Sequence, residues 1–105
     1  MAADRTSVTT LRGHEIMAGG QWIRIYLTCT NAAAATDYVD INDVTGLPGS
    51  AMVGKILFVE AVRDYAGTAV PDAVYWTSTY PDRLVIGTGA DSKTRAWMVI
   101  AEGTA

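Results

Sequence analysis

Residues 21–30 alternate strictly between two kinds of side chain. The aliphatic residues Ile23, Ile25 and Leu27 and the thiol of Cys29 fall on one side of an extended backbone, and Trp22, Arg24, Tyr26 and Thr28 fall on the other. Successive side chains of a β-strand point to opposite faces, so the pattern predicts a strand with one core-facing side. Gly19-Gly20 separates it from residues 14–17 and is typical of a tight turn, because glycine accepts positive φ. The sequence therefore predicts an opening β-hairpin.

Turn-forming residues divide the rest of the chain into short apolar segments. Strands are predicted at residues 37–44, 55–63, 73–79, 83–88 and 93–101. The segments between them, 45–50, 64–72, 80–82 and 89–92, are rich in Gly, Pro, Asp or Ser. The nearly continuous apolar run at 55–63 indicates a central strand covered on both faces, although its pattern also allows an amphipathic helix.

These segments predict an all-β fold, a single small β-sandwich or barrel of about seven short, mainly antiparallel strands. Residues 1–12 are polar and lack a strong period, so we expect them to form an N-terminal arm, with the β domain spanning residues 13–105. The predicted core contains Ile23, Ile25, Leu27, Val39, Ile41, Ile56, Phe58, Val85, Val99 and Ile100.

Composition excludes several classes of protein. Half of the 105 residues are apolar and 18% are charged, which is typical of a folded chain. The net charge of −3 argues against nucleic-acid binding, which depends on clustered Lys and Arg. Cys29 is the only cysteine and cannot form an internal disulfide. No segment resembles a signal peptide or reaches the ~20 apolar residues that span a bilayer, so we expect a soluble protein made in the cytosol.

Two motifs suggest ligand binding but lack the required spacing. The acidic segment 37–43 could supply oxygen ligands to Ca²⁺, but Val44 and Ala51 stand where an EF-hand needs ligands. The segment 87–92 begins like a dinucleotide-binding fingerprint but lacks its third glycine, and too few residues follow for a βαβ unit. We therefore predict no metal and no cofactor.

His14, Glu15 and Cys29 are the best candidates for a nucleophile and its base. Cys29, however, lies on the aliphatic side of its strand, where cysteine usually behaves as a small buried apolar residue. We therefore predict that the chain has no catalytic residues and is not an enzyme.

Trp22, Arg24 and Tyr26 lie opposite the aliphatic side of their strand, and these residue types are enriched in interface hot spots. Arginine, which is favoured in protein interfaces, accounts for six of the eight basic residues. We predict partner binding by Arg5, Arg12, Trp22, Arg24 and Tyr26. Two other interpretations stay open: a second layer or the arm covers the three outward residues, or their rings form a sugar-binding platform.

The order of segments resembles the small β proteins of tailed-bacteriophage particles. The resemblance rests on a polar start, a strand after Gly-Gly, the segments DYVDIND, FVEAVRD, V-x-W-T and RLVIGTG, and a closing AWMVIAEGT. It implies a non-enzymatic virion protein that decorates and stabilises a capsid. Its partners would be the major capsid protein or other virion subunits and copies of itself, as a homo-oligomer or trimer. Such proteins often clasp a neighbour with a terminal arm.

Alternative functions remain open at this point. The chain could be a small tail, neck or fibre component, or a carbohydrate-binding module displayed on a particle. An ordered arm on another chain would favour lattice binding, whereas exposed coplanar rings with polar neighbours would favour sugar binding.

Overall fold

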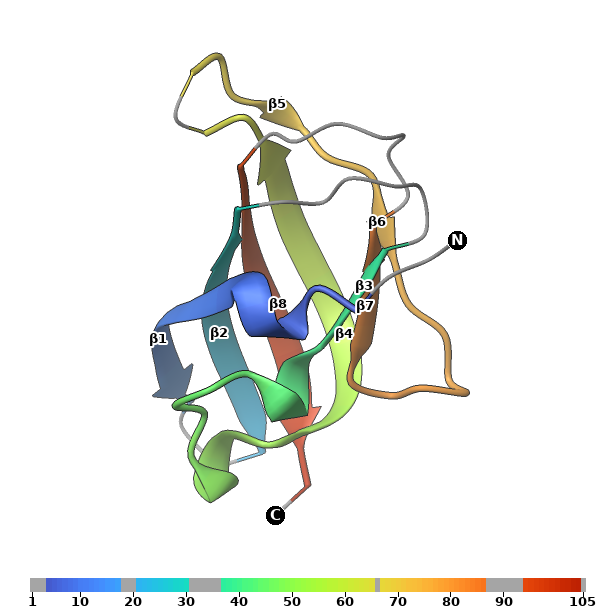
Figure 1. The fold of residues 1–105 in the computed structure, drawn as a ribbon. Helices are drawn as coiled ribbons and strands as arrows, with labels where there is room; N and C mark the ends of the chain where they lie inside the picture. Colours follow the sequence, from blue (N-terminus) through green and yellow to red (C-terminus); the bar gives the residue numbers. More distant parts are fainter. Residues whose placement is uncertain (1–3, 18–20, 31–36, 66, 87–93, 105) are drawn as a thin grey trace.

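The structure is a computed structural model that describes residues 4–17, 21–30, 37–65, 67–86 and 94–104 (Figure 1). The described residues contain eight strands in two antiparallel sheets, which confirms the predicted all-β class and is consistent with a small sandwich. The strands are β1 (Thr9–Ile16), β2 (Trp22–Cys29), β3 (Tyr38–Asp40), β4 (Val53–Arg63), β5 (Val70–Pro71), β6 (Val74–Tyr75), β7 (Arg83–Ile86) and β8 (Arg95–Gly103). Three short 3₁₀ helices are η1 (Thr6–Val8), η2 (Ile41–Asp43) and η3 (Gly49–Ala51).

The larger sheet has the strand order β1-β2-β8-β4-β5, and the smaller has the order β3-β7-β6. β8 lies between β2 and β4 and pairs with both along its whole length. The last strand of the chain is therefore the centre of the large sheet. No helix in the described part of the chain is long and apolar enough to cross a membrane.

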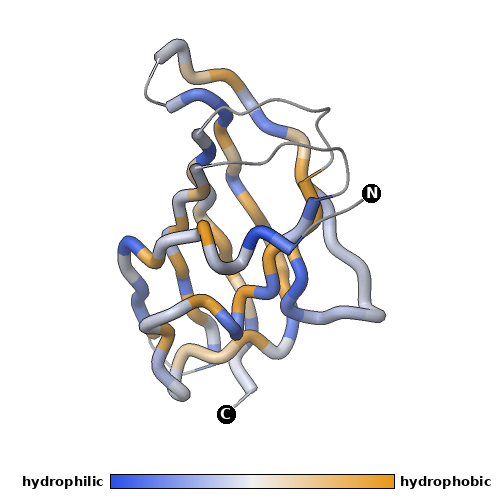
Figure 2. The backbone as a smooth tube through the Cα atoms, viewed as in Figure 1, coloured by the Kyte–Doolittle hydropathy of each residue, from blue (hydrophilic) through white to orange (hydrophobic). Residues whose placement is uncertain are grey.

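The core lies between the two sheets and follows the alternation along the strands, which is visible in Figure 2. β2, β8 and β4 contribute Ile23, Ile25, Leu27, Cys29, Trp97, Val99, Ala101, Val53 and Ile56. The small sheet and the segment after β3 contribute Val39, Leu84, Ile86, Ile41, Val44, Leu47 and Ala51. Removal of this apolar surface from water is the main stabilising contribution to such a fold.

Residues 55–63 form a strand, so the helical alternative is wrong, but this strand is not covered on both faces. Phe58 is 51% exposed, and Val85 and Ile100, also predicted as core, are only partly buried. The register places Phe58 beside Ile100, on the side of the sheet away from the core. Each of these residues alternates with a core-facing neighbour, and no described layer covers the outer side.

β1 begins at Thr9, so residues 9–12, predicted as part of the arm, belong to the large sheet. The pairing of β1 with β2 contains a bulge between Leu11 and Gly13, which places Arg12 outside the regular register. A bulge interrupts period-2 alternation, so this half of the strand carries no clear pattern in the sequence. Residues ahead of β1 also belong to the domain, since the Arg5 amide donates a 2.7 Å hydrogen bond to the Tyr38 carbonyl.

Two predicted strands are shorter than expected. After β3 the chain turns into η2, where the Val44 amide donates to the Ile41 carbonyl at 3.1 Å, so residues 41–44 leave the sheet. β6 covers only Val74–Tyr75 of the predicted 73–79. The predicted turns at Gly19-Gly20 and 89–92, and the end of the strand predicted at 83–88, lie outside the described residues.

Candidate functional site

The outer side of the large sheet carries the side chains that alternate with the core residues. We call it the open face; it comprises Trp22, Arg24, Tyr26 and Thr28 of β2, Phe58, Glu60 and Val62 of β4, Ala96, Met98, Ile100 and Glu102 of β8, and Arg12 and Glu15 of β1. Cross-strand pairing sets these residues in rows. Arg24, Ile100 and Phe58 form one row, and Tyr26, Met98 and Glu60 form the next.

Apolar side chains cross the middle of the open face. Trp22 is 50% exposed and Phe58 51% exposed, while Met98 and Ile100 between them are partly buried by their neighbours. No described element of the chain packs over these residues. Exposed apolar patches on a folded domain are typical of surfaces that bind another molecule.

Charges border this apolar surface asymmetrically. On the β1–β2 side, Arg24 Nη1 lies 3.2 Å from Glu15 Oε1 and donates a 3.2 Å hydrogen bond to the Tyr26 hydroxyl. That hydroxyl in turn donates to Glu15 at 3.2 Å. The hydrogen bond to Tyr26 and the nearby carboxylate of Glu15 raise the pKa of Arg24 above its ordinary value. Arg24 is cationic, as arginine is in proteins generally. Glu60 supplies a carboxylate on the β4 side.

A shallow groove of about 260 Å³ hollows the open face. Arg12, Tyr26 and Thr28 border one side of it, Glu60 and Val62 the other, with Met98 between them. Arg12 is fixed there because its Nε donates a 2.8 Å hydrogen bond to Thr28 Oγ1. The groove therefore has an apolar floor and one charged group of each sign at its borders.

Four of the five predicted partner-binding residues, Arg12, Trp22, Arg24 and Tyr26, come together on the open face. Arg5 does not join them. Its Nε lies 3.0 Å from Oδ2 of Asp37, whose side chain is fully buried, and its amide bonds to Tyr38 of the small sheet. Arg5 thus ties the start of the chain to the other layer.

Sequence reasoning missed the other half of the open face, which β4 and β8 provide. Phe58 and Ile100 are predicted as core residues, and Met98, which alternation places on the same side of the last strand as Ile100, is not among the predicted binding residues. The signal was present in the alternation of Met98 and Ile100 with Trp97 and Val99. Ala96, Met98 and Ile100 on the outer side of β8 are all apolar, and the polar residue Glu102 comes only near the end of the strand, so the middle of β8 carries no sign of exposure.

The candidates for nucleophilic chemistry do not meet. His14 is exposed on β1 opposite Ile25, whereas Cys29 is fully buried at the far end of β2, opposite Thr9. Among the described residues, no three His, Cys, Asp or Glu side chains are grouped so that they could hold a metal ion.

Arg83 of β7 stacks on two tyrosine rings, Tyr38 of β3 and Tyr80 of the connection from β6 to β7. Its guanidinium carbon lies 3.9 Å from the centre of the Tyr38 ring and 4.0 Å from that of Tyr80. Its Nε donates a 2.8 Å hydrogen bond to Asp40 Oδ1, and this bond raises the pKa of Arg83. Arg83 thus covers one face of each ring in a cation–π arrangement.

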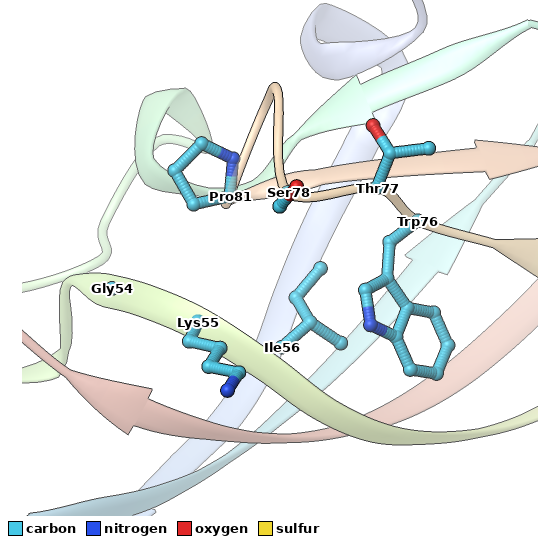
Figure 3. A pocket seen from close by; sticks show the side chains of 7 residues that line it. All are labelled: Gly54, Lys55, Ile56, Trp76, Thr77, Ser78 and Pro81. Atoms are coloured by element: carbon cyan, nitrogen blue, oxygen red, sulfur yellow. The ribbon is translucent and has the colours of Figure 1, made fainter.

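A second cavity, of about 450 Å³, lies between β4 and the connection from β6 to β7 (Figure 3). Its lining residues are Gly54, Lys55, Ile56, Trp76, Thr77, Ser78 and Pro81. Figure 3 shows Ile56 and Trp76 extending into the space between the two segments.

Comparison of the chain with protein-family models, with curated proteins and with solved structures found no match.

Proposed function

We propose that this protein is a non-enzymatic structural protein of a tailed-phage particle, which binds and stabilises the capsid lattice through its open face. The observation that carries the proposal is the apolar surface from Trp22 to Phe58, which no described element covers. The phage assignment itself comes from the resemblance of the sequence segments to small virion β proteins.

The chemistry of the open face supports a protein partner. Trp and Tyr contribute large contact areas at low entropic cost, and a cationic Arg24 can form a bidentate pair with a carboxylate of the partner. Arg24 is already oriented by Tyr26 and Glu15, so less conformational freedom is lost on binding. Because many identical copies would bind a repeating lattice, modest affinity at each contact is sufficient for firm attachment.

The structure changes the expected role of the N-terminal segment. Residues 9–12 belong to β1, and Arg5 is engaged with Asp37 inside the domain. Deletion of residues 2–12 would remove half of an edge strand and the Arg5 side chain that pairs with the buried Asp37 carboxylate, so it would test folding rather than binding. Binding is therefore assigned to the open face and not to an arm over residues 4–12.

Single substitutions on the open face test the proposal. Trp22→Ala and Phe58→Ala each remove an exposed ring from this face, and Tyr75→Ala, at 45% exposure on the small sheet, is the matched control. Removal of an interface hot spot costs about 2 kcal/mol or more. We therefore expect Trp22→Ala and Phe58→Ala to lower retention on purified particles about tenfold or more in competition with the wild type, with Tyr75→Ala unchanged.

All three variants should give the far-ultraviolet circular dichroism of the wild type, because each changes one exposed ring. Equal occupancy of the open-face variants and the control would contradict the proposed surface. Absence of the protein from purified particles would contradict the virion assignment. Analysis of separated heads and tails distinguishes a capsid location from a tail, neck or fibre location.

A further inference from the structure

One edge of β4 is largely without a strand partner in the described part of the chain. β8 pairs along one side of β4, whereas β5 pairs on the other side only at Val62 and Arg63. The next contact on this side is a 3.0 Å hydrogen bond from the Asp72 amide to the Ala61 carbonyl. The β4 edge over residues 54–60 therefore stays open.

The hydrogen-bond register shows which backbone groups point off this edge. The Asp64 amide donates at 2.6 Å to the Thr94 carbonyl on the β8 side, and the Ala61 carbonyl accepts from Asp72 on the opposite side. The N–H and C=O of one residue in an antiparallel strand point the same way, and the direction alternates along the strand. Val59 therefore directs both its N–H and its C=O to the open edge.

The 450 Å³ cavity lies along the same edge. Its two walls are β4 residues 54–56 and the connection at 76–81, and no backbone hydrogen bond between described residues joins 76–78 to β4. Figure 3 shows the apolar side chains of Ile56 and Trp76 between the walls, whereas the Thr77 side chain points away from β4. The cavity thus has apolar side chains between its two walls, with Lys55 and Ser78 also in its lining.

We infer that this edge accepts an extended segment of another protein chain as an added β-strand. The backbone of that segment bonds to the N–H and C=O of Val59, and one of its apolar side chains enters the cavity between Ile56 and Trp76. In strand addition the main-chain bonds provide affinity, and pockets for alternate side chains provide specificity. The open edge is long enough for an added strand of about five residues, the usual strand length.

The irregularity of β4 argues against a second copy of β4 as the occupant. Its pairing with β8 shifts register between Val53 and Lys55 and again between Ile56 and Phe58. Two copies of such a bulged edge cannot align over more than a few residues, and Lys55 discourages pairing of two edges. A foreign segment with a regular extended backbone has neither restriction.

The inference goes beyond the proposed function, because it concerns a different surface and a different mode of binding. It stands if the open face binds nothing, and it fails independently if the edge of β4 accepts no strand.

The probe is a peptide that binds the purified full chain, selected from a random eight-residue library displayed on filamentous phage. A selected peptide is then titrated into ¹⁵N-labelled protein. We expect saturable shifts in the amides of residues 54–61 and in the indole signal of Trp76. Two variants test the two parts of the site: Val59→Pro removes an edge donor at a position where proline is tolerated, and Trp76→Ala removes one wall of the cavity.

Loss of the Val59 hydrogen bond or of the Trp76 contact should weaken peptide binding about tenfold, while Trp22→Ala on the open face should leave it unchanged. If Val59→Pro does not fold, the affinity of Trp76→Ala for the peptide and the positions of the shifted amides test the inference. The inference is overturned if no peptide is enriched, if the shifts lie on the open face, or if folded variants bind as the wild type does. It is also overturned if dilution of the free protein produces the same shifts, because the occupant would then be a second copy.

Discussion

Two carboxylates with fully buried side chains are paired with arginines. Arg95 Nε lies 3.0 Å from Asp72 Oδ2, with both side chains fully buried. Arg5 Nε lies at the same distance from Asp37 Oδ2, but the Arg5 side chain is 24% exposed. Arg95 faces the core side of β8, and Asp72 follows β5, so the pair links the centre of the large sheet to the connection leading into the small one. Desolvation of the two ions offsets most of their mutual attraction, so the pair adds little net stability. Removal of one partner alone is nevertheless strongly destabilising, because a charge then stays buried.

Arg95→Met should therefore lower the free energy of unfolding by about 3–5 kcal/mol, because it removes the buried arginine charge that pairs with the Asp72 carboxylate. The double variant Arg95→Met with Asp72→Leu should recover most of this loss, since both charges are then absent. Urea denaturation of the two single variants and the double variant gives the coupling energy. Additive effects of the two substitutions would contradict the coupling.

The 3₁₀ helix η2, which follows β3, is attached to the start of β4 by the side chain of Asn42. Asn42 of η2 accepts a 2.7 Å hydrogen bond from the Val53 amide at Oδ1 and donates a 3.0 Å bond from Nδ2 to the Val53 carbonyl. The side chain thus satisfies both backbone groups of the first residue of β4, as a neighbouring strand would. This is the local reason that the predicted strand at 37–44 ends at Asp40 and gives way to η2.

Asn42→Ala should cost about 1–3 kcal/mol, because two partly buried backbone groups lose their partner. Asn42→Asp should cost at least as much at pH 7, since a carboxylate oxygen then faces the Val53 carbonyl. Repulsion of the charged form raises the folded pKa of the new carboxyl above its unfolded value, so protonation favours the folded state. The loss of unfolding free energy caused by Asn42→Asp should therefore become smaller as the pH falls towards about 4. The loss caused by Asn42→Ala should not change with pH. Thermal unfolding as a function of pH measures both.

The two sheets differ in the support that their strands receive. β8 has a full-length neighbour on each side, whereas β7 pairs with three residues of β3 and two of β6. Local opening of the small sheet breaks few hydrogen bonds, but opening of β8 dismantles the large sheet. The stability of the molecule is therefore unevenly distributed.

Amide hydrogen exchange should show this difference. We expect the amides of β2 and β8 to exchange only through global unfolding, and those of β6 and β7 to exchange at least about tenfold faster through local opening. Exchange followed by NMR at increasing urea concentration separates the two processes. Equal protection of the two sheets would show that they unfold as one cooperative unit.

Regular alternation along the sequence predicts the strands and the side of each strand that faces the core. Ile23, Ile25, Leu27 and Val99 are buried as predicted, because burial of alternate side chains is a local property of an extended backbone. It also gathered Trp22, Arg24 and Tyr26 correctly on one side of β2, since all three belong to one alternating strand.

Which strands are neighbours and which sides stay uncovered depends on contacts between segments far apart in the sequence, and these are visible only in the tertiary structure. The pairing of β8 with both β2 and β4 adds Met98, Ile100 and Phe58 to the open face. Such pairing joins distant segments, so it produces no periodic pattern in the sequence. The bulge at Arg12 removed the alternation that would have revealed the start of β1. The pairing of Arg5 with Asp37 likewise depends on contact across 32 positions of the chain, which no local pattern encodes.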